Sequence, residues 1–314
     1  MKAKVLEDGT LLLTDLHGNP IPNGQHSEAI RRNMPAILDM LEQRATDLNE
    51  WLSKMLLPHW TTPDPREASA PFQPAPFLLA KPEQPEVEEV GKIAAWFGEK
   101  ERAESRYQEK MATFQSALAE WRAEEANHRY RQEELRKQYL SLSSGDERAM
   151  LQRFEDRLAK ITWPRETIVT FQGNVKSVWV DIDLPEIEDM PQEIAKVLRR
   201  YMKVVWIPKS NIDVRRDYMA HIHSIGFRVA GEAFAAMPDL ERIVVSGYSQ
   251  RQCRDTGQVK NEYLYSVGID RTKWMGINFS DLCAIDPIQA FERFDLRRNL
   301  SKTAHFSPIS PFTS

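Results

Sequence analysis

The spacing of hydrophobic residues changes along the chain and divides it into two halves of different character. Up to about residue 161, apolar residues recur every three or four positions, which is typical of amphipathic helices. From residue 162 onward they alternate over short segments, which is typical of strands. The pattern predicts an α+β protein, in which a long, coiled-coil-like helical arm precedes a domain of β-hairpins packed with helices.

Residues 1–57 are predicted to form a hairpin followed by a helix. Apolar runs flank Asp8-Gly9, a pair that favours the tight turn of a hairpin. From Ser27 to about Leu57 the apolar residues follow helical spacing and form one stripe. The stripe consists of Ile37, Leu41, Ala45, Leu48, Leu52 and Met55.

Residues 58–85 are predicted to be a proline-rich linker. They contain eight prolines, and each proline fixes φ and removes a backbone donor. An extended chain is therefore expected. The same stretch also carries Trp60, Phe72 and Phe77, which a purely solvated linker would not need. We expect part of it to lie on an apolar groove.

Residues 86–161 carry the longest helical signal, which runs from 86 to 142 and is followed by a short helix. An apolar seam with spacings of three and four indicates a partner surface like that of a coiled coil. Phe114, Leu118 and Trp121 place the largest apolar area on this seam and are the predicted partner-binding residues. Three partners remain open: the stripe on residues 35–57, a second copy of the chain, or a different protein.

Residues 162–314 are predicted to form an α+β domain that folds alone. Two β-hairpins are expected, at 166–183 and 243–270, together with helices at 192–203 and 212–237. Within the second helix, the small residues Gly226, Ala230 and Gly231 leave room for another element to approach closely.

Composition narrows the functional classes. The chain has 314 residues, 41% of them hydrophobic, and a net charge of -4, with -5 on residues 1–160 and +1 on residues 161–314. Neither half is broadly basic, so nucleic-acid binding has weak support. Two cysteines cannot build a disulfide framework or a cysteine-based zinc site, which favours the cytoplasm. No run of 18 uncharged apolar residues occurs, so no membrane partner is expected.

Two carboxylates on one predicted strand are the candidate metal ligands. Asp181 and Asp183 alternate onto the same face, where they could hold Mg²⁺ or Mn²⁺. A metal-dependent nuclease would also need a carboxylate or amide two residues before a lysine on a neighbouring strand. Gln258 and Lys260 have that spacing in this half, but they fall in a predicted loop. A solvated strand end explains the acidic residues equally, so no cofactor is expected outside the nuclease alternative.

Other chemical candidates have simple structural explanations. His221 and His223 are two residues apart on a predicted helix, so they cannot share a metal ion and are expected to pack or to form hydrogen bonds. Arginines flank Cys253 and would lower the pKa of its thiol, but no sequence signature pairs it with a histidine base. No glycine-rich phosphate loop occurs in the sequence.

The C-terminal half carries a resemblance. Segments such as residues 180–191, 218–238 and 261–271 resemble the C-terminal region of a group of bacterial proteins of unknown function. The resemblance covers about residues 163–312, implies a domain boundary near residue 162 and assigns no role to any residue. The expected function is that of a bacterial cytoplasmic interaction or assembly protein, which recruits another protein or a second copy through its arm. The alternative is a metal-dependent nuclease or another nucleic-acid enzyme.

Overall fold

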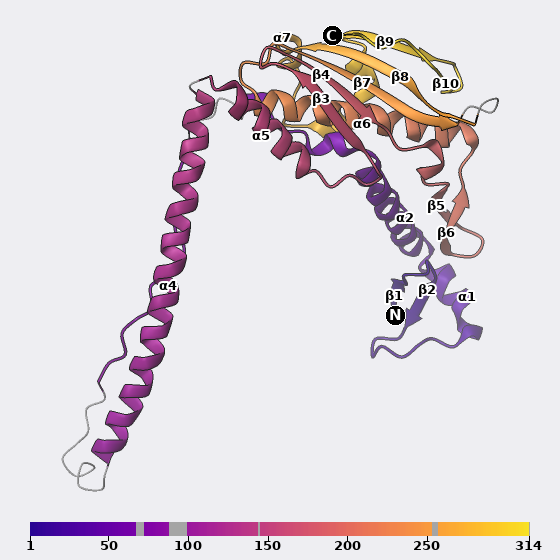
Figure 1. Ribbon diagram of the computed structural model, residues 1–314. Helices are drawn as coiled ribbons and strands as arrows, with labels where there is room; N and C mark the ends of the chain where they lie inside the picture. Colours follow the sequence, from indigo (N-terminus) through magenta and orange to yellow (C-terminus); the bar gives the residue numbers. More distant parts are fainter. Residues whose placement is uncertain (67–71, 88–98, 144, 253–256, 314) are drawn as a thin grey trace. The chain divides into compact units, whose positions relative to one another are not determined.

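The structure is a computed structural model of the chain (Figure 1) and describes residues 1–66, 72–87, 99–143, 145–252 and 257–313. The chain divides into two compact units, Met1–Ala68 with Met150–Ser314, and Ser69–Ala149. The α+β class is confirmed.

The bounds of the elements follow the chain. Before the second unit come β1 (Lys2–Val5), β2 (Leu11–Thr14), α1 (Asn23–Arg32), α2 (Met34–Leu56) and the 3-10 helix η1 (Pro58–Thr61). The long helix α4 (Glu99–Ser143) belongs to the second unit. After it come α5 (Glu147–Ala159), β3 (Ile168–Gly173), β4 (Ser177–Asp183), η3 (Ile187–Asp189), β5 (Glu193–Leu198), β6 (Lys203–Pro208), α6 (Asn211–Ala236), β7 (Arg242–Gln252), β8 (Val259–Asp270), α7 (Arg271–Trp274), η4 (Leu282–Ala284), α8 (Pro287–Phe291), β9 (Asp295–Leu300) and β10 (Phe306–Ser307).

A six-stranded mixed sheet with the order β10-β9-β8-β7-β4-β3 forms the larger part of the first unit. The predicted hairpins β3–β4 and β7–β8 are confirmed, and β4 pairs with β7 in parallel. A parallel pair needs a crossover connection, which here contains α6. One face of the sheet packs on α6 (Figure 1). On β4, every second side chain points to this face and is buried.

Helix α6 is the centre of the first unit, and its small residues let neighbouring elements come close. The Tyr265 hydroxyl donates a hydrogen bond to the carbonyl of Ile222 at 3.1 Å. A Cβ on Gly226 would lie 2.5 Å from that hydroxyl oxygen, and a Cβ on Gly231 would overlap the side chain of Thr62. The sequence predicted that another element approaches α6 closely, and two elements do so: Tyr265 of β8 lies against Gly226, and Thr62 lies against Gly231.

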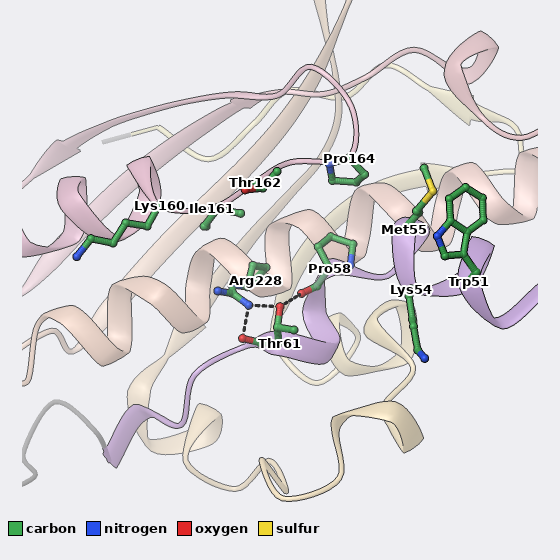
Figure 2. A pocket seen from close by; sticks show the side chains of 10 residues that line it. All are labelled: Trp51, Lys54, Met55, Pro58, Thr61, Lys160, Ile161, Thr162, Pro164 and Arg228. Atoms are coloured by element: carbon green, nitrogen blue, oxygen red, sulfur yellow. Dashed lines mark hydrogen bonds between the residues drawn. The ribbon is translucent and has the colours of Figure 1, made fainter. Parts of the chain in front are cut away.

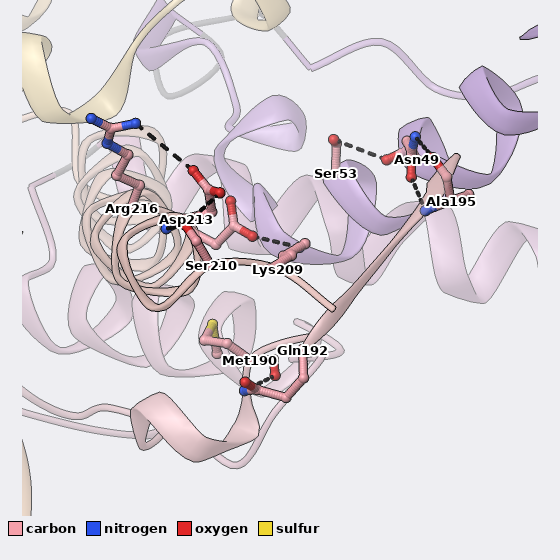
Figure 3. A network of polar contacts seen from close by, with 10 residues as sticks. Asn49, Ser53, Met190, Gln192, Ala195, Lys209, Ser210, Asp213 and Arg216 are labelled. Carbon is pink, nitrogen blue, oxygen red and sulfur yellow. Dashed lines mark hydrogen bonds and ion pairs between the residues drawn. The ribbon is translucent and has the colours of Figure 1, made fainter. Parts of the chain in front are cut away.

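The N-terminal segment shares this unit's core. Four residues of the apolar stripe of α2 are buried: Ile37, Leu41, Ala45 and Leu52. Ile37 and Leu41 belong to one cluster with Ala195 and Val204 of the β5–β6 hairpin. The side chain of Asn49 forms two hydrogen bonds with the backbone of Ala195, as a neighbouring strand would (Figure 3). It donates to the carbonyl at 2.9 Å and accepts from the amide at 3.0 Å. The buried part of this stripe therefore packs within its own unit.

Two further expectations differ from the structure. Residues 193–198 form strand β5 rather than part of a helix, because pairing with β6 and the bonds from Asn49 outweigh the local helical pattern. The sequence also placed a domain boundary near residue 162, whereas residues 1–68 complete the core of the C-terminal half. A fragment of residues 162–314 would expose the hairpin face that α2 covers, so we do not expect it to fold alone.

The seating of Thr62 on Gly231 gives a direct test of the α6 packing. Gly231→Ala adds a methyl group that overlaps Thr62, so we expect a loss of about 1–3 kcal/mol in the free energy of unfolding. Urea denaturation monitored by circular dichroism measures it. Gly276→Ala is the matched control, because its nearest neighbour lies at 3.4 Å, an ordinary contact. Equal stability of the two variants would contradict the packing described.

Candidate functional site

An open groove runs beside α6 in the first unit (Figure 2). Its volume is about 470 Å³, which is within the range of known ligand sites. The end of α2 and η1 form one wall, the segment after α5 forms the other, and Arg228 of α6 lies between them. The lining residues are Trp51, Lys54, Met55, Pro58, Thr61, Lys160, Ile161, Thr162, Pro164 and Arg228.

The groove combines an apolar lining with positive charge. Lys54, Lys160 and Arg228 contribute three cations, and no acidic residue occurs among the described residues that line it. Lys54 makes a 3.0 Å ion pair with Glu50, but both side chains are more than half exposed, so this pair is weak. Trp51 is 57% exposed, which is unusual for so large an apolar side chain.

Arg228 is held rigidly at the floor of the groove. One of its nitrogens makes a 2.5 Å ion pair with buried Glu232, and another donates to the carbonyl and hydroxyl oxygens of Thr61. Glu232 also accepts from Arg157 at 2.5 Å. The buried Nε of Arg228 has no hydrogen-bond partner among the described residues. These contacts hold the guanidinium group of Arg228 in a fixed position at the groove, where its positive charge could attract an acidic ligand.

His59 and Ser224 form a buried pair that resembles part of a nucleophilic site. His59 Nδ1 lies 2.8 Å from the Ser224 hydroxyl, and Nε2 lies 3.0 Å from the carbonyl of Ile285. Since a carbonyl only accepts, Nε2 carries the proton and Nδ1 accepts from the serine. Both side chains are fully shielded from solvent, so no substrate reaches the serine. The pair fastens η1 to α6.

His221 and His223 are also buried and lie apart, as the sequence predicted. The Nδ1 atom of His221 lies 2.7 Å from the carbonyl of Leu56. Arg298 donates to Nε2 of His223 at 3.0 Å, which requires the neutral tautomer with the proton on Nδ1. Burial lowers the pKa of His59 and of His221, and burial together with Arg298 lowers the pKa of His223 to about 3.

Because the pKa values of these three histidines are lowered by folding, we expect the free energy of unfolding to decrease at acidic pH. The unfolded chain takes up their protons near pH 6.5, whereas the folded chain takes them up only at lower pH, so stability falls as pH drops below 6.5. We expect losses of up to about 1.4 kcal/mol per pH unit for each histidine. Urea unfolding at pH 7, 6 and 5 measures the slope. His223→Gln should flatten the slope more than a change of the exposed His17 to Gln does; identical slopes in both variants would contradict this origin.

Asp181 and Asp183 share one face of β4, as the alternation predicted, and this is the face away from α6. Each carboxylate has its own neutral partner. Asp181 forms a hydrogen bond with the side chain of Tyr263, and Asp183 accepts from Gln250 at 2.6 Å. Burial raises the pKa of both carboxyl groups. Among the described residues no group of three histidine, cysteine or carboxylate side chains could hold a metal ion. Of the two cysteines, Cys283 is exposed and free, and Cys253 lies outside the described residues.

The second unit, which we call the arm, consists of α4 and an extended proline-rich segment (Figure 1). Phe114, Leu118 and Trp121 are half-buried on one side of α4. The ring of Phe77 packs on that of Trp121 with centroids 5.6 Å apart, and Trp121 Nε1 donates to the carbonyl of Leu79 at 2.9 Å. Part of the proline-rich linker was expected to lie on an apolar groove, and the described part of it that belongs to the arm lies on the seam of α4.

The extended segment runs antiparallel to α4. The carbonyl of Ala75 accepts from His128 at 2.9 Å, and its amide donates to Gln132 at 2.9 Å. Phe72 lies further along, against Tyr139. Successive residues of the segment thus contact earlier and earlier turns of the helix. The described part of the arm leaves the seam only half covered.

The groove residues were missed by sequence reasoning. Trp51 gave one signal, because it is a large aromatic residue one position away from the apolar stripe of α2. Lys160 and Arg228 gave none, because they are distant in sequence and only folding brings them to one groove.

Comparison with family models, curated proteins and solved structures found no match for this chain. Within the part of the chain that the structure describes, none of the helices has the length and apolar character needed to cross a bilayer.

Proposed function

We propose that this protein is an interaction or assembly protein of the bacterial cytoplasm, and that the arm binds its partner. The observation that supports this proposal is the lack of an enclosed core in the arm. Among the arm residues whose burial is described, Ala103 is the one buried hydrophobic residue. A single helix with one extended segment cannot enclose apolar side chains, and association removes them from water.

The surface available for association combines both elements of the arm. Leu78 is 87% exposed, and Leu79, 54% exposed, meets Trp121 through its carbonyl. Together with Phe114 and Leu118 on the preceding turns, these residues form what we call the arm patch. Burying such side chains contributes about 1.5–3 kcal/mol each, which outweighs the exposed ion pairs of α4 at about 0.2–1 kcal/mol.

A second copy of the chain is the simplest partner for the arm patch. Two arms side by side would each cover the half-exposed seam of the other, in the manner of a helical pair. The apolar seam keeps the three- and four-residue spacing from Tyr107 to Trp121, which is long enough for about four turns of contact. A different protein with a helix of the same kind is the other outcome.

Leu78→Ser combined with Leu79→Ser tests the patch with little effect on folding. Both side chains are exposed, so the variant should keep the thermal stability of the wild type while association weakens by about tenfold or more. Analytical ultracentrifugation of the full chain and affinity capture from the native host measure association. Unchanged mass and unchanged partner capture would contradict the proposal.

The triple change of Phe114, Leu118 and Trp121 to Ser removes the seam itself. We expect loss of association, together with release of the extended segment, because Phe77 loses the ring on which it packs. Tyr130→Ser with Leu140→Ser is the matched control, since both are exposed on α4 outside the seam. If the control lost association as fully as the triple variant, the effect would come from general loss of apolar surface.

A further inference from the structure

The groove beside α6 has the properties of a site for an extended acidic segment. Its lining offers apolar side chains and three cations, and Trp51 stands exposed within it. Grooves with exposed aromatic residues commonly bind extended, proline-containing chain, because such chain loses little conformational freedom on binding. The positive charge adds a requirement for acidic residues next to an apolar side chain.

The same chain carries a segment of that chemistry in the arm. Residues 82–87 read Pro-Glu-Gln-Pro-Glu-Val, and the sequence continues with two more glutamates. The described residues form neither helix nor strand. Glu83 and Glu86 are exposed, and Val87 is 70% exposed. The arm therefore presents an acidic, extended stretch with an apolar side chain that has no cover.

The geometry points to a contact between copies, in which the groove of one protein binds residues 83–87 of a second copy. Lys54 and Lys160 would face the glutamates, and Val87 would lie on the apolar lining with Trp51. Groove and segment are different surfaces, so the contact is head-to-tail and can extend to a ring or a chain of molecules. It adds a partner to the proposed assembly role, but it uses a surface separate from the arm patch.

A peptide of residues 82–90 tests the groove without the arm patch. We expect a fluorescently labelled peptide to bind the full-length protein, as measured by anisotropy, and to bind less tightly at higher salt. Lys54→Glu and Lys160→Glu should each weaken binding about three- to tenfold, since each loses an attraction and gains a repulsion. Lys176→Glu is the control, because Lys176 is similarly exposed in the same unit and does not line the groove.

A charge-exchange experiment then decides between a second copy and the same chain. One full-length variant carries Lys54→Glu and Lys160→Glu, and another carries Glu83→Lys and Glu86→Lys. In the proposed contact each variant alone loses head-to-tail association, since its groove and its segment carry like charge. Their mixture restores the contact, because the unaltered groove of one meets the unaltered segment of the other.

Three results would overturn the proposal. They are absence of peptide binding, equal effects of the groove and control changes, and failure of the mixture to restore association. Binding of the peptide without restoration would show that the groove takes its own arm or another acidic ligand. The Leu78 and Leu79 variant, in which the acidic segment is intact, separates failure of this contact from failure of the arm patch.

Discussion

The first unit depends on how the short stretch from Leu56 to Thr62 seats on α6. Four contacts fasten it: the carbonyl of Leu56 to His221, His59 to Ser224, Thr61 to Arg228, and Thr62 on Gly231. The unit is interrupted in sequence by the whole arm, so its two parts are joined by packing rather than by a short connection. The same stretch forms a wall of the groove, which links the stability of the unit to its candidate binding site.

The charges beneath this stretch place Arg228 in a fixed position. The carboxylate of Glu232 is almost fully buried and forms ion pairs with Arg157 and Arg228, each with a nitrogen–oxygen distance of 2.5 Å. Such buried ion pairs contribute little net stability, because desolvation offsets their attraction, but loss of one partner is costly. Their clearest effect here is on position, since Arg228 cannot leave the groove floor without depriving buried Glu232 of one of its two ion pairs.

Features that depend on neighbours in sequence could be predicted, and features that depend on distant neighbours could not. The Asp8-Gly9 hairpin, the small residues of α6 and the seam of α4 all follow from local spacing. Strand β5 could not be predicted, because Asn49 and β6 convert a helical pattern into a strand. The groove could not be predicted either, because Trp51, Lys160 and Arg228 are distant in sequence and line one groove only after α2, α5 and α6 have packed.

The antiparallel run of an extended segment along α4 couples the lengths of the two elements. A helix rises about 1.5 Å per residue and an extended proline-rich chain about 3.1 Å, so one residue of the segment spans about two of the helix. From the Phe72–Tyr139 pair to the Leu79–Trp121 pair, seven residues of the segment pass 18 residues of the helix, a ratio between two and three. Lengthening the stretch where segment and helix are paired therefore requires insertions in both elements, with more residues in the helix than in the segment and whole heptads in the helix to keep the seam in phase.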